Sequence, residues 1–334
     1  MRITTIDAHT AGEPLRVITG GFPPVQGDSI LAMRAYAREH CDHVRTALMF
    51  EPRGHADMYG CLLVPAPTDD GDIGVLFLHN EGYSTMCGHG IIALVKVGLE
   101  HDLFQPADES AIRIDTPAGR VTARAVREGD RVVSVVFENV PSFVLESQLV
   151  LDIDGVDEVV CDIAFGGAFY AYVDAASCGL TIDGARAQEI IDIGMRIKHA
   201  VMKSYSIVHP AGDPDLNFLY GTILHEAGKN GAHTRNACVF AEGELDRSPT
   251  GTGVSGWLAI CLARGVLNIG DSITIESILG TRFDVKAAHT CDLGPANEIL
   301  AVIPEVTGSA FITGHHEFVI DPHDPLKDGF LLGR

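Results

Sequence analysis

The sequence has few aromatic side chains and few positive charges. Aromatic residues make up 7% of the chain, and Trp257 is the only tryptophan. Lys and Arg number 24 against 45 Asp and Glu, which gives a formal net charge of −21. Single-stranded nucleic acids bind by stacking on aromatic rings and by contacts with basic surfaces. The composition therefore argues against a nucleic-acid-binding protein, and the acidic surface argues against binding to anionic membranes.

Long apolar runs and an apolar leader are also missing. The longest apolar runs, near IIALVKVGL (91–99), are far shorter than the roughly 20 residues that span a bilayer. The opening residues, MRITTIDAHTAGEP, do not resemble a secretory leader, so we expect a cytoplasmic protein. The eight cysteines include no Cys-x-x-Cys pair. In a cytosolic chain we expect them to be thiols, most of them small core residues.

What the sequence does contain is an internal repeat. Its 334 residues suffice for two domains of about 150 residues each. MCGHGIIALVKVGL (86–99) and PTGTGVSGWLAICL (249–262) share one design: a small nucleophilic or hydroxylic residue, then Gly-x-Gly, then an apolar helical run. In this alignment Cys87 corresponds to Thr250.

Two further landmarks repeat in the same order. A strand–turn–strand pattern with Gly119 matches a second one with Gly280, and the segment around Gly12 resembles the segment around Gly167. Three ordered matches indicate a duplicated α/β unit. We therefore predict a first half over residues 1–155, a second half over 156–309 and a C-terminal segment, 310–334, of unknown packing. The crossover between the halves is expected near 143–158.

Local patterns predict some of the elements. The segment 28–41 (DSILAMRAYAREHC) has the spacing of an amphipathic helix with Asp28 as its N-cap, and 186–203 has the spacing of its counterpart. Apolar runs at 74–78 and 132–140 predict strands.

The repeated Gly-rich turn is the candidate site. Glycines let the backbone approach a ligand, and the first N–H groups of the following helix point at an anion. Such a turn binds a carboxylate without a basic side chain and lowers the pKa of a thiol, here Cys87. Neither copy has the Gly-Lys-Ser/Thr ending of a phosphate-binding loop. Gly251, Gly253 and Gly256 match a dinucleotide fingerprint, but Cys87 in the first copy disfavours a phosphate role.

These motifs resemble those of a known family. MCGHG (86–90) and DRSPTGTGVSG (246–256), together with DAHTAGEP (7–14) and GGAFYA (166–171), are similar to the proline racemase family over essentially the whole chain. The resemblance implies an α/β fold of the diaminopimelate epimerase type. In that fold two pseudo-symmetric halves each wrap strands around a central helix, and one substrate binds at the two helix N-termini.

The resemblance also implies roles for individual residues. Family racemases carry a cysteine in each motif, one to remove the α-proton and one to return a proton to the opposite face. Carried over by position, Cys87 is the base and Thr250 stands at the place of the second cysteine. The side chains of Asp246 and His89 would face the ring nitrogen of the substrate. Its carboxylate would be bound by the backbone of Gly88, His89, Gly251 and Thr252.

Thr250 is the departure from the racemase pattern. A hydroxyl is a far weaker acid than a thiol, and the Cys/Thr combination resembles the members that dehydrate trans-3-hydroxy-L-proline to Δ1-pyrroline-2-carboxylate. In that substrate the α-hydrogen and the 3-hydroxyl share a ring face. We therefore hypothesise a syn elimination in which Cys87 takes the proton and passes it to the leaving hydroxide, with Thr250 as a spectator or hydrogen-bond donor.

Other interpretations stay open at this point. A 4-hydroxyproline epimerase or proline racemase with one cysteine is the nearest alternative, and an amino-acid-binding protein without activity is another. No pyridoxal-binding lysine motif is apparent, so we expect no cofactor and a free amino acid as the small-molecule partner. The histidine clusters at 40–43 and 315–323 have no counterpart in the other half, so we expect no metal. His225 and His233 are candidates for approaching the substrate. Enzymes of this kind are often homodimers, and the sequence leaves the oligomeric state open.

Overall fold

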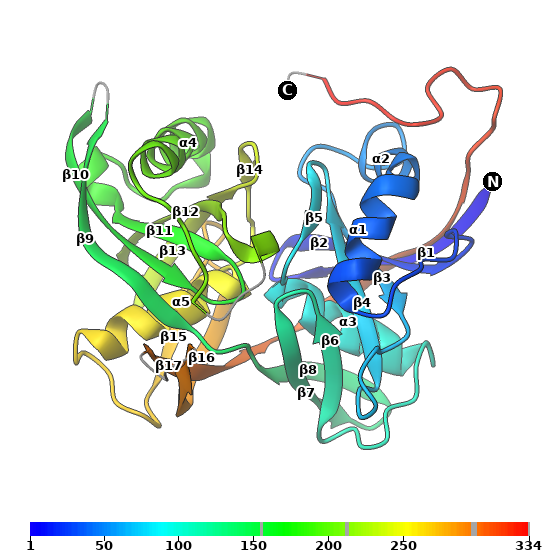
Figure 1. The fold of residues 1–334 in the computed structure, drawn as a ribbon, viewed down its shortest axis with the longest axis horizontal. Helices are drawn as coiled ribbons and strands as arrows, with labels where there is room; N and C mark the ends of the chain where they lie inside the picture. Colours follow the sequence, from blue (N-terminus) through cyan, green and yellow to red (C-terminus); the bar gives the residue numbers. More distant parts are fainter. Residues whose placement is uncertain (154–155, 211–213, 295–298, 333–334) are drawn as a thin grey trace. The chain divides into compact units, whose positions relative to one another are not determined.

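The computed structural model describes residues 1–153, 156–210, 214–294 and 299–332. It divides into two compact units, Met1–Phe137 with Gly308–Arg334 and Glu138–Thr307. Each unit packs strands around one apolar helix, which is drawn in cyan in the first unit and in yellow in the second (Figure 1). Within the described part of the chain, no helix combines the length and the apolar character needed to cross a membrane.

The first unit pairs its strands in the order β18–β1–β2–β3–β4, and β4 also pairs with β5 and with the β6–β7 hairpin. The β2–β3 and β4–β6 pairs are parallel, and the others are antiparallel. The elements are β1 (Arg2–Thr10), β2 (Glu13–Gly20), α1 (Ile30–His40), α2 (Asp42–Met49), β3 (Tyr59–Val64), β4 (Ile73–His79), β5 (Gly82–Ser84), α3 (Gly88–Glu100), β6 (Ile112–Thr116), β7 (Gly119–Glu128), β8 (Arg131–Glu138) and β18 (Ala310–Val319).

Two helical layers cover opposite faces of the strands in this unit. Leu76 and Leu78 of β4 belong to the hydrophobic cluster that includes the buried faces of α1 and α2. Phe77, between them, lies against Gly90 of α3 on the other face. Because side chains alternate along a strand, the buried strand β4 packs against α1 and α2 with one face and against α3 with the other. This explains why 74–78 reads as a continuous apolar run.

The predicted helix at 28–41 is present, but its cap is different. α1 begins at Ile30, and the N-cap is Ser29, whose Oγ accepts a hydrogen bond of 3.1 Å from the amide of Ala32. Asp28 is therefore not the cap. A serine hydroxyl caps as well as a carboxylate does, so two adjacent candidates cannot be separated by propensity alone.

The second unit repeats the pairing pattern. Its strands pair in the order β9–β10–β11–β12–β13, and β13 also pairs with β14 and with β15, which continues into β16 and β17. The elements are β9 (Phe143–Ile153), β10 (Val156–Phe165), β11 (Phe169–Asp174), η1 (Ala175–Cys178), η2 (Gly184–Arg186), α4 (Ala187–Ser204), η3 (Pro214–Leu216), β12 (Leu219–Ala227), β13 (Thr234–Phe240), β14 (Glu244–Leu245), α5 (Gly251–Ala263), β15 (Ser272–Glu276), β16 (Arg282–Leu293) and β17 (Ile299–Gly308).

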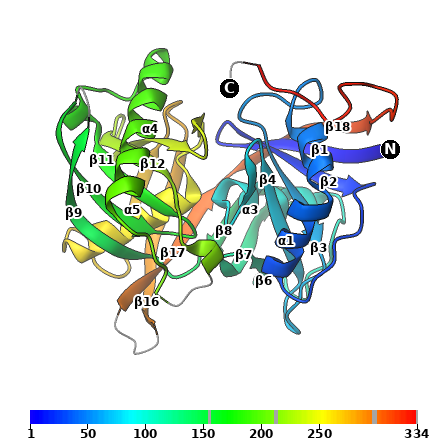
Figure 2. The ribbon, with the colours of Figure 1, turned by 45° about the horizontal axis from the view of Figure 1, so that its top comes forward.

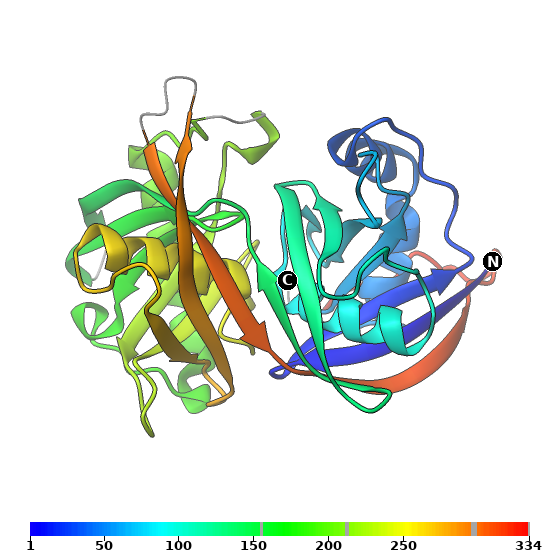
Figure 3. The same ribbon diagram turned by 90° about the horizontal axis from the view of Figure 1, so that it is seen from below.

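Helices α4 and α5 lie on opposite faces of the second sheet. Thr222 of β12 donates a hydrogen bond of 2.9 Å to the carbonyl of Gly194 in α4. The next residue, Ile223, lies against Gly253 of α5. The long β16 strand packs along α5, and β16 and β17 run side by side as orange arrows in Figure 3. The expected counterpart of α1 at 186–203 is α4, which begins and ends one residue later.

The pairings confirm that the chain is a duplicated unit. β1–β2–β3–β4–β6–β7 and β10–β11–β12–β13–β15–β16 have the same sequence of antiparallel and parallel neighbours. The turns that begin the two halves contain Gly12 (φ 101°) and Gly167 (φ 108°), and the later hairpins contain Gly119 and Gly280, also at positive φ. These are backbone conformations that favour glycine.

The division between the units falls earlier than 155. Residues 143–153, expected as part of a crossover, form β9, which pairs antiparallel with β10 inside the second unit. Residues 154–155 lie outside the described residues. The equivalent place beside β1 is taken by β18 from the C-terminal segment, which thereby belongs to the first unit (Figure 2). A strand pair that joins residues 2 and 319 leaves no local signal in the sequence.

A buried arginine ties the first unit together. The Arg16 guanidinium donates to both carboxylate oxygens of Asp7 at 2.8–3.1 Å and to the carbonyls of Leu48 and Arg53 at 2.6 and 2.7 Å. Its carbon lies 4.2 Å from the centre of the Phe318 ring of β18. Arg16 is 5% exposed, so its charge is neutralised by these partners and not by water. One side chain thus joins β1, β2, α2 and β18.

We predict that Arg16→Met lowers the free energy of unfolding of the first unit by about 3 kcal/mol, because the substitution leaves the Asp7 carboxylate buried without its main partner. Urea unfolding followed by circular dichroism measures the change. Arg131→Met, which removes an exposed pair with Glu128, is the control and should change stability by less than about 0.5 kcal/mol. Equal effects of the two substitutions would contradict the role of Arg16.

Candidate active site

Cys87 is the N-cap of α3. Its φ and ψ of −145° and 106° are extended, and its Sγ accepts a hydrogen bond of 3.2 Å from the amide of Gly90. A side chain at position 90 would meet both Sγ at 2.8 Å and the Phe77 ring at 2.9 Å, so only glycine allows this close approach. Cys87 is 4% exposed. The sulfur therefore lies at the positive end of a buried helix, beside a backbone donor.

His89 lies against the sulfur. Its Nδ1 and Nε2 atoms are 3.3 and 3.6 Å from the Cys87 Sγ. The ring meets Tyr59 edge-on with 4.9 Å between centroids, and the His89 carbonyl accepts a hydrogen bond of 2.9 Å from the Thr10 hydroxyl. Both the side chain and the backbone of His89 are thus held by neighbouring strands, and the imidazole is placed to exchange a proton with the thiol.

Thr250 takes the same position at the start of α5, with a different geometry. Its φ of 67° is a left-handed value that is unfavourable for a β-branched residue. Its hydroxyl donates a hydrogen bond of 2.7 Å to Asp246 Oδ2, and its amide donates one of 3.0 Å to the Ser248 hydroxyl. The other Asp246 oxygen accepts from the Ser248 amide at 2.7 Å. All three residues are buried. These bonds hold the strained backbone and direct the Thr250 hydroxyl proton to Asp246.

Two tyrosines of β11 anchor the first turn of α5. The Tyr170 hydroxyl lies 2.8 Å from the Thr252 hydroxyl, and the Tyr172 hydroxyl donates to the carbonyl of Gly253 at 2.8 Å. Both rings are almost completely buried. A side chain at position 256 would lie 2.2 Å from the Tyr172 oxygen, which explains the third glycine of the motif.

Asn139, which directly follows β8, also holds the first turn of α5. The Asn139 amide donates to the carbonyl of Gly166 and to the Ser255 hydroxyl, both at 2.8 Å. Ser255 in turn donates to the carbonyl of Gly251 at 2.8 Å. The first carbonyl of α5 is therefore bonded within the unit, which orients the peptide planes of the turn.

The motif comparison did not identify these supporting residues. Ser248 lies inside the quoted DRSPTG segment, and its spacing of two from Asp246 and from Thr250 is a recognisable turn pattern. The two tyrosines occupy alternate positions of FYAYV, which marks them as neighbours on one strand face. Thr10 lies inside the quoted DAHTAGEP segment, but its bond to the distant His89 carbonyl leaves no sequence signal, and Asn139 lies outside every quoted motif.

The remaining cysteines have a different environment. Burial raises the pKa of the thiol to about 12 at Cys161 and about 11 at Cys261, and it raises the thiol pKa at Cys41, Cys61, Cys178 and Cys291 as well. All eight cysteines are free, as the sequence predicted. Thiols with raised pKa values are protonated near pH 7 and are poor bases.

The histidines considered as further site residues lie elsewhere in the second unit. The His225 ring packs on Trp257 with 4.3 Å between centroids, about two helical turns from Thr250, and burial lowers its pKa to about 4. His233 accepts a hydrogen bond from the Thr274 amide at the β15 strand. Neither is brought to the start of α5. Among the described residues no group of His, Cys, Asp or Glu side chains is arranged to hold a metal ion.

Comparisons with known proteins identify the family. Residues 5–331 match the proline racemase family. The chain is 48% identical to a trans-3-hydroxy-L-proline dehydratase of Bacillus cereus over 337 residues, 99% of this chain and 98% of that protein. It is 45% identical to a protein of the same name from Homo sapiens over 340 residues, 99% of this chain and 94% of that protein. The chain therefore belongs to the proline racemase family.

A solved structure gives the same result for the fold. A hydroxyproline epimerase from Agrobacterium vitis, crystallised with bound trans-4-hydroxy-L-proline, superposes with a TM-score of 0.92 at 31% identity. The match covers 99% of this chain and 96% of that one. The predicted fold, two pseudo-symmetric α/β halves of the diaminopimelate epimerase type, is confirmed.

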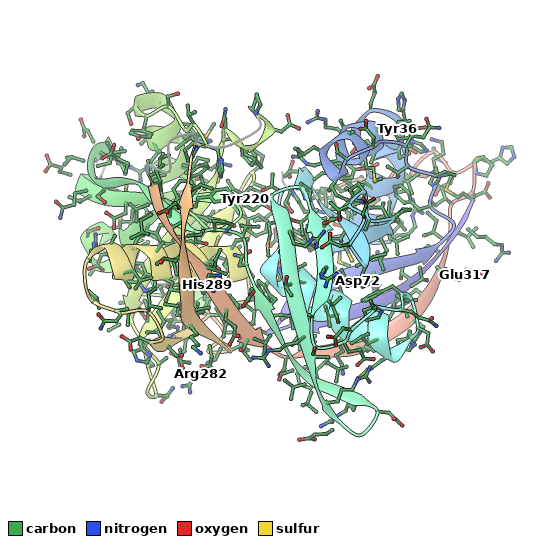
Figure 4. The ribbon with its side chains drawn as sticks, turned by 60° about the horizontal axis from the view of Figure 1, so that its bottom comes forward. Tyr36, Asp72, Tyr220, Arg282, His289 and Glu317 are labelled. Atoms are coloured by element: carbon green, nitrogen blue, oxygen red, sulfur yellow. The ribbon has the colours of Figure 1, made fainter. Side chains whose placement is uncertain are left out.

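We predict that Tyr172→Phe lowers the free energy of unfolding by about 1–2 kcal/mol, because it leaves the buried Gly253 carbonyl without its donor. Tyr36→Phe is the matched control. Tyr36 is labelled in Figure 4 and lies on α1, and its ring packs against His40, so the substitution should be nearly neutral. Chemical denaturation of the two variants measures the difference. Equal stability of both would show that the Tyr172 hydroxyl contributes nothing to the turn.

Proposed function

We propose that this protein is a trans-3-hydroxy-L-proline dehydratase. It would remove the α-proton of its substrate with Cys87 and release the 3-hydroxyl as water, which gives Δ1-pyrroline-2-carboxylate. The names of the Bacillus cereus and human relatives support this substrate. The observation that carries the proposal is Thr250, a hydroxyl bonded to Asp246 at the position where racemases have their second thiol.

The stereochemistry of the substrate favours one reactive face. The α-hydrogen and the 3-hydroxyl of trans-3-hydroxy-L-proline project from the same face of the ring. A racemase needs a proton donor on the opposite face, whereas an elimination does not. Thr250 is a poor donor because its pKa is far above that of a thiol and its proton is already bonded to a carboxylate. Groups on the Cys87 face suffice for elimination, with no proton donor on the opposite face.

The substrate carboxylate is assigned to the helix starts. We assign its binding to the backbone N–H groups of Gly88 and His89 in α3 and of Gly251 and Thr252 in α5. The first amides of a helix lack intrahelical partners and favour an anion. As negative charge spreads from Cα onto the carboxylate, these dipoles stabilise it more strongly, which is the main source of catalysis in such a site. Asp246 would pair with the cationic ring nitrogen of the substrate.

The alternative is epimerisation of 4-hydroxyproline, which the structural similarity to the Agrobacterium vitis enzyme favours. The two reactions differ in the fate of Cα. An epimerase returns a solvent proton to the opposite face and changes the optical rotation of trans-4-hydroxy-L-proline. A dehydratase forms a pyrroline from trans-3-hydroxy-L-proline and leaves the 4-hydroxy isomer unchanged.

We predict that the purified protein forms Δ1-pyrroline-2-carboxylate from trans-3-hydroxy-L-proline, detected with o-aminobenzaldehyde, and that Cys87→Ser lowers kcat at least about a thousand-fold through loss of the base. Cys178→Ser, at a partly exposed thiol, should keep full activity. Polarimetry on trans-4-hydroxy-L-proline should show no change. Rotation without pyrroline formation would make the protein an epimerase and overturn the proposal.

We predict that Thr250→Cys gains slow epimerisation of trans-4-hydroxy-L-proline, because a thiol at position 250 can protonate the second face. The φ of 67° is no worse for cysteine than for β-branched threonine, so the fold should persist. Thr250→Ser keeps a hydroxyl that can bond to Asp246 and is the control without epimerase activity. Incorporation of solvent deuterium at Cα measures the gain. Epimerisation by the serine variant would contradict the proposal that a thiol at position 250 is needed to protonate the second face.

A further inference from the structure

The contact between Cys87 and His89 is the starting point. A thiol must lose its proton before it can act as a base, and the His89 imidazole lies beside it, with nitrogens 3.3 and 3.6 Å from Sγ. The Gly90 amide donates to the same sulfur at 3.2 Å and so stabilises the negative charge that proton transfer leaves there. The three groups lie within one turn of α3, where a thiolate and an imidazolium would stabilise each other if the proton moved.

The elimination also needs an acid. Hydroxide is a poor leaving group and departs far more readily when it takes a proton as the C–O bond breaks. Thr250 is poorly suited, because its hydroxyl already donates to Asp246. If Cys87 acts alone, it must give the α-proton away at the moment that it binds it. An imidazolium beside the thiolate removes this conflict.

We propose that His89 is the second catalytic residue: it takes the proton of the Cys87 thiol and delivers it to the departing 3-hydroxyl. The inference rests on the proposed dehydratase function and names its general acid. In the syn elimination described above, Cys87 alone was both base and acid; here Cys87 is the base and His89 the acid. The His89 imidazole thus acts at the sulfur and not, as expected from the sequence, at the ring nitrogen of the substrate.

The protons and electrons balance over one turnover. The thiol proton passes to His89, which leaves a thiolate and an imidazolium. The thiolate binds the α-proton, and the electron pair of the Cα–H bond forms the double bond to C3. The C3–O bond breaks with its electrons on oxygen, which takes the imidazolium proton and leaves as water. The enamine tautomerises to Δ1-pyrroline-2-carboxylate, and both side chains return to their starting protonation states.

The position of the imidazole suits this division of roles. The α-hydrogen and the 3-hydroxyl are substituents of neighbouring ring atoms on one face, so their base and acid must also be neighbours. Sγ and the His89 nitrogens are such a pair, on residues two apart. The imidazole is held by Tyr59, whose hydroxyl bonds Ser84 at 2.5 Å and whose ring stacks on His79. A fixed ring gives the acid its orientation before substrate binds.

The experiment compares two leaving groups. His89→Gln and the wild type are assayed at pH 9 with trans-3-hydroxy-L-proline and with trans-3-fluoro-L-proline, because fluoride leaves without a full proton transfer. We expect the variant to lose about 10²–10⁴-fold in kcat on the hydroxy substrate and less than about tenfold on the fluoro substrate. His101→Gln, at the other end of α3, controls for removing a histidine from this helix and should react with both like the wild type.

A spectroscopic titration tests the first proton transfer separately. Thiolate absorbance near 240 nm, taken as the difference from Cys87→Ser, reports Cys87 alone. Six of the other thiols have pKa values raised by burial and contribute little near pH 7. In His89→Gln the midpoint should move upward by about one pH unit or more, because the imidazolium partner is gone. His89→Asn replaces the glutamine variant if that one does not fold.

The outcomes separate the two levels of the proposal. No pyrroline from either substrate with the wild-type protein would overturn the dehydratase function itself. Pyrroline from the wild type with equal losses on both substrates in His89→Gln would leave the dehydratase function intact and overturn His89 as the acid. Full activity of His89→Gln on the hydroxy substrate, or an unmoved thiolate midpoint, would likewise overturn the inference alone.

Discussion

The amide groups that begin α3 and α5 are buried, and the side chains around them are arranged to hold these two helix starts. Neither first turn carries an acidic residue, so the positive end of each helix is not cancelled from within. Strand side chains instead bind the first-turn carbonyls, Thr10 in one unit and Tyr172 in the other. These bonds fix the orientation of the peptide planes at both helix starts. If the substrate carboxylate binds there as proposed, backbone dipoles would attract it despite the net charge of −21.

The two helix starts have diverged in chemistry on a common backbone plan. Cys87 has an extended conformation, caps its own helix and lies against an imidazole. Thr250 has a left-handed conformation, and its hydroxyl donates a hydrogen bond to the Asp246 carboxylate. The two helix starts therefore differ in their neighbouring groups, an imidazole beside the thiol and a carboxylate beside the hydroxyl. This asymmetry is what the proposed one-faced elimination would require.

Much of this organisation was predictable from the sequence, and the limits have a physical origin. The repeat and the Cys87 and Thr250 turns depend on local patterns of glycine and apolar spacing, which can be recognised in the sequence alone. The network through Asn139, Tyr170 and Tyr172 depends on hydrogen bonds to residues 27 to 116 positions away. The identity of one residue does not indicate such a distant partner. The left-handed φ of Thr250 also opposes its intrinsic preference.

The pairing of β18 with β1 has a consequence for biosynthesis. The ribosome delivers β1 long before β18, so one edge of β1 has no partner until residues 310–319 have been made. The second unit, whose β9 directly precedes β10, meets no such delay. A nascent chain therefore carries an open strand edge until β18 is made, the kind of surface on which chaperones act and from which aggregation starts. Selection on the C-terminal segment would then reflect yield in the cell as much as turnover.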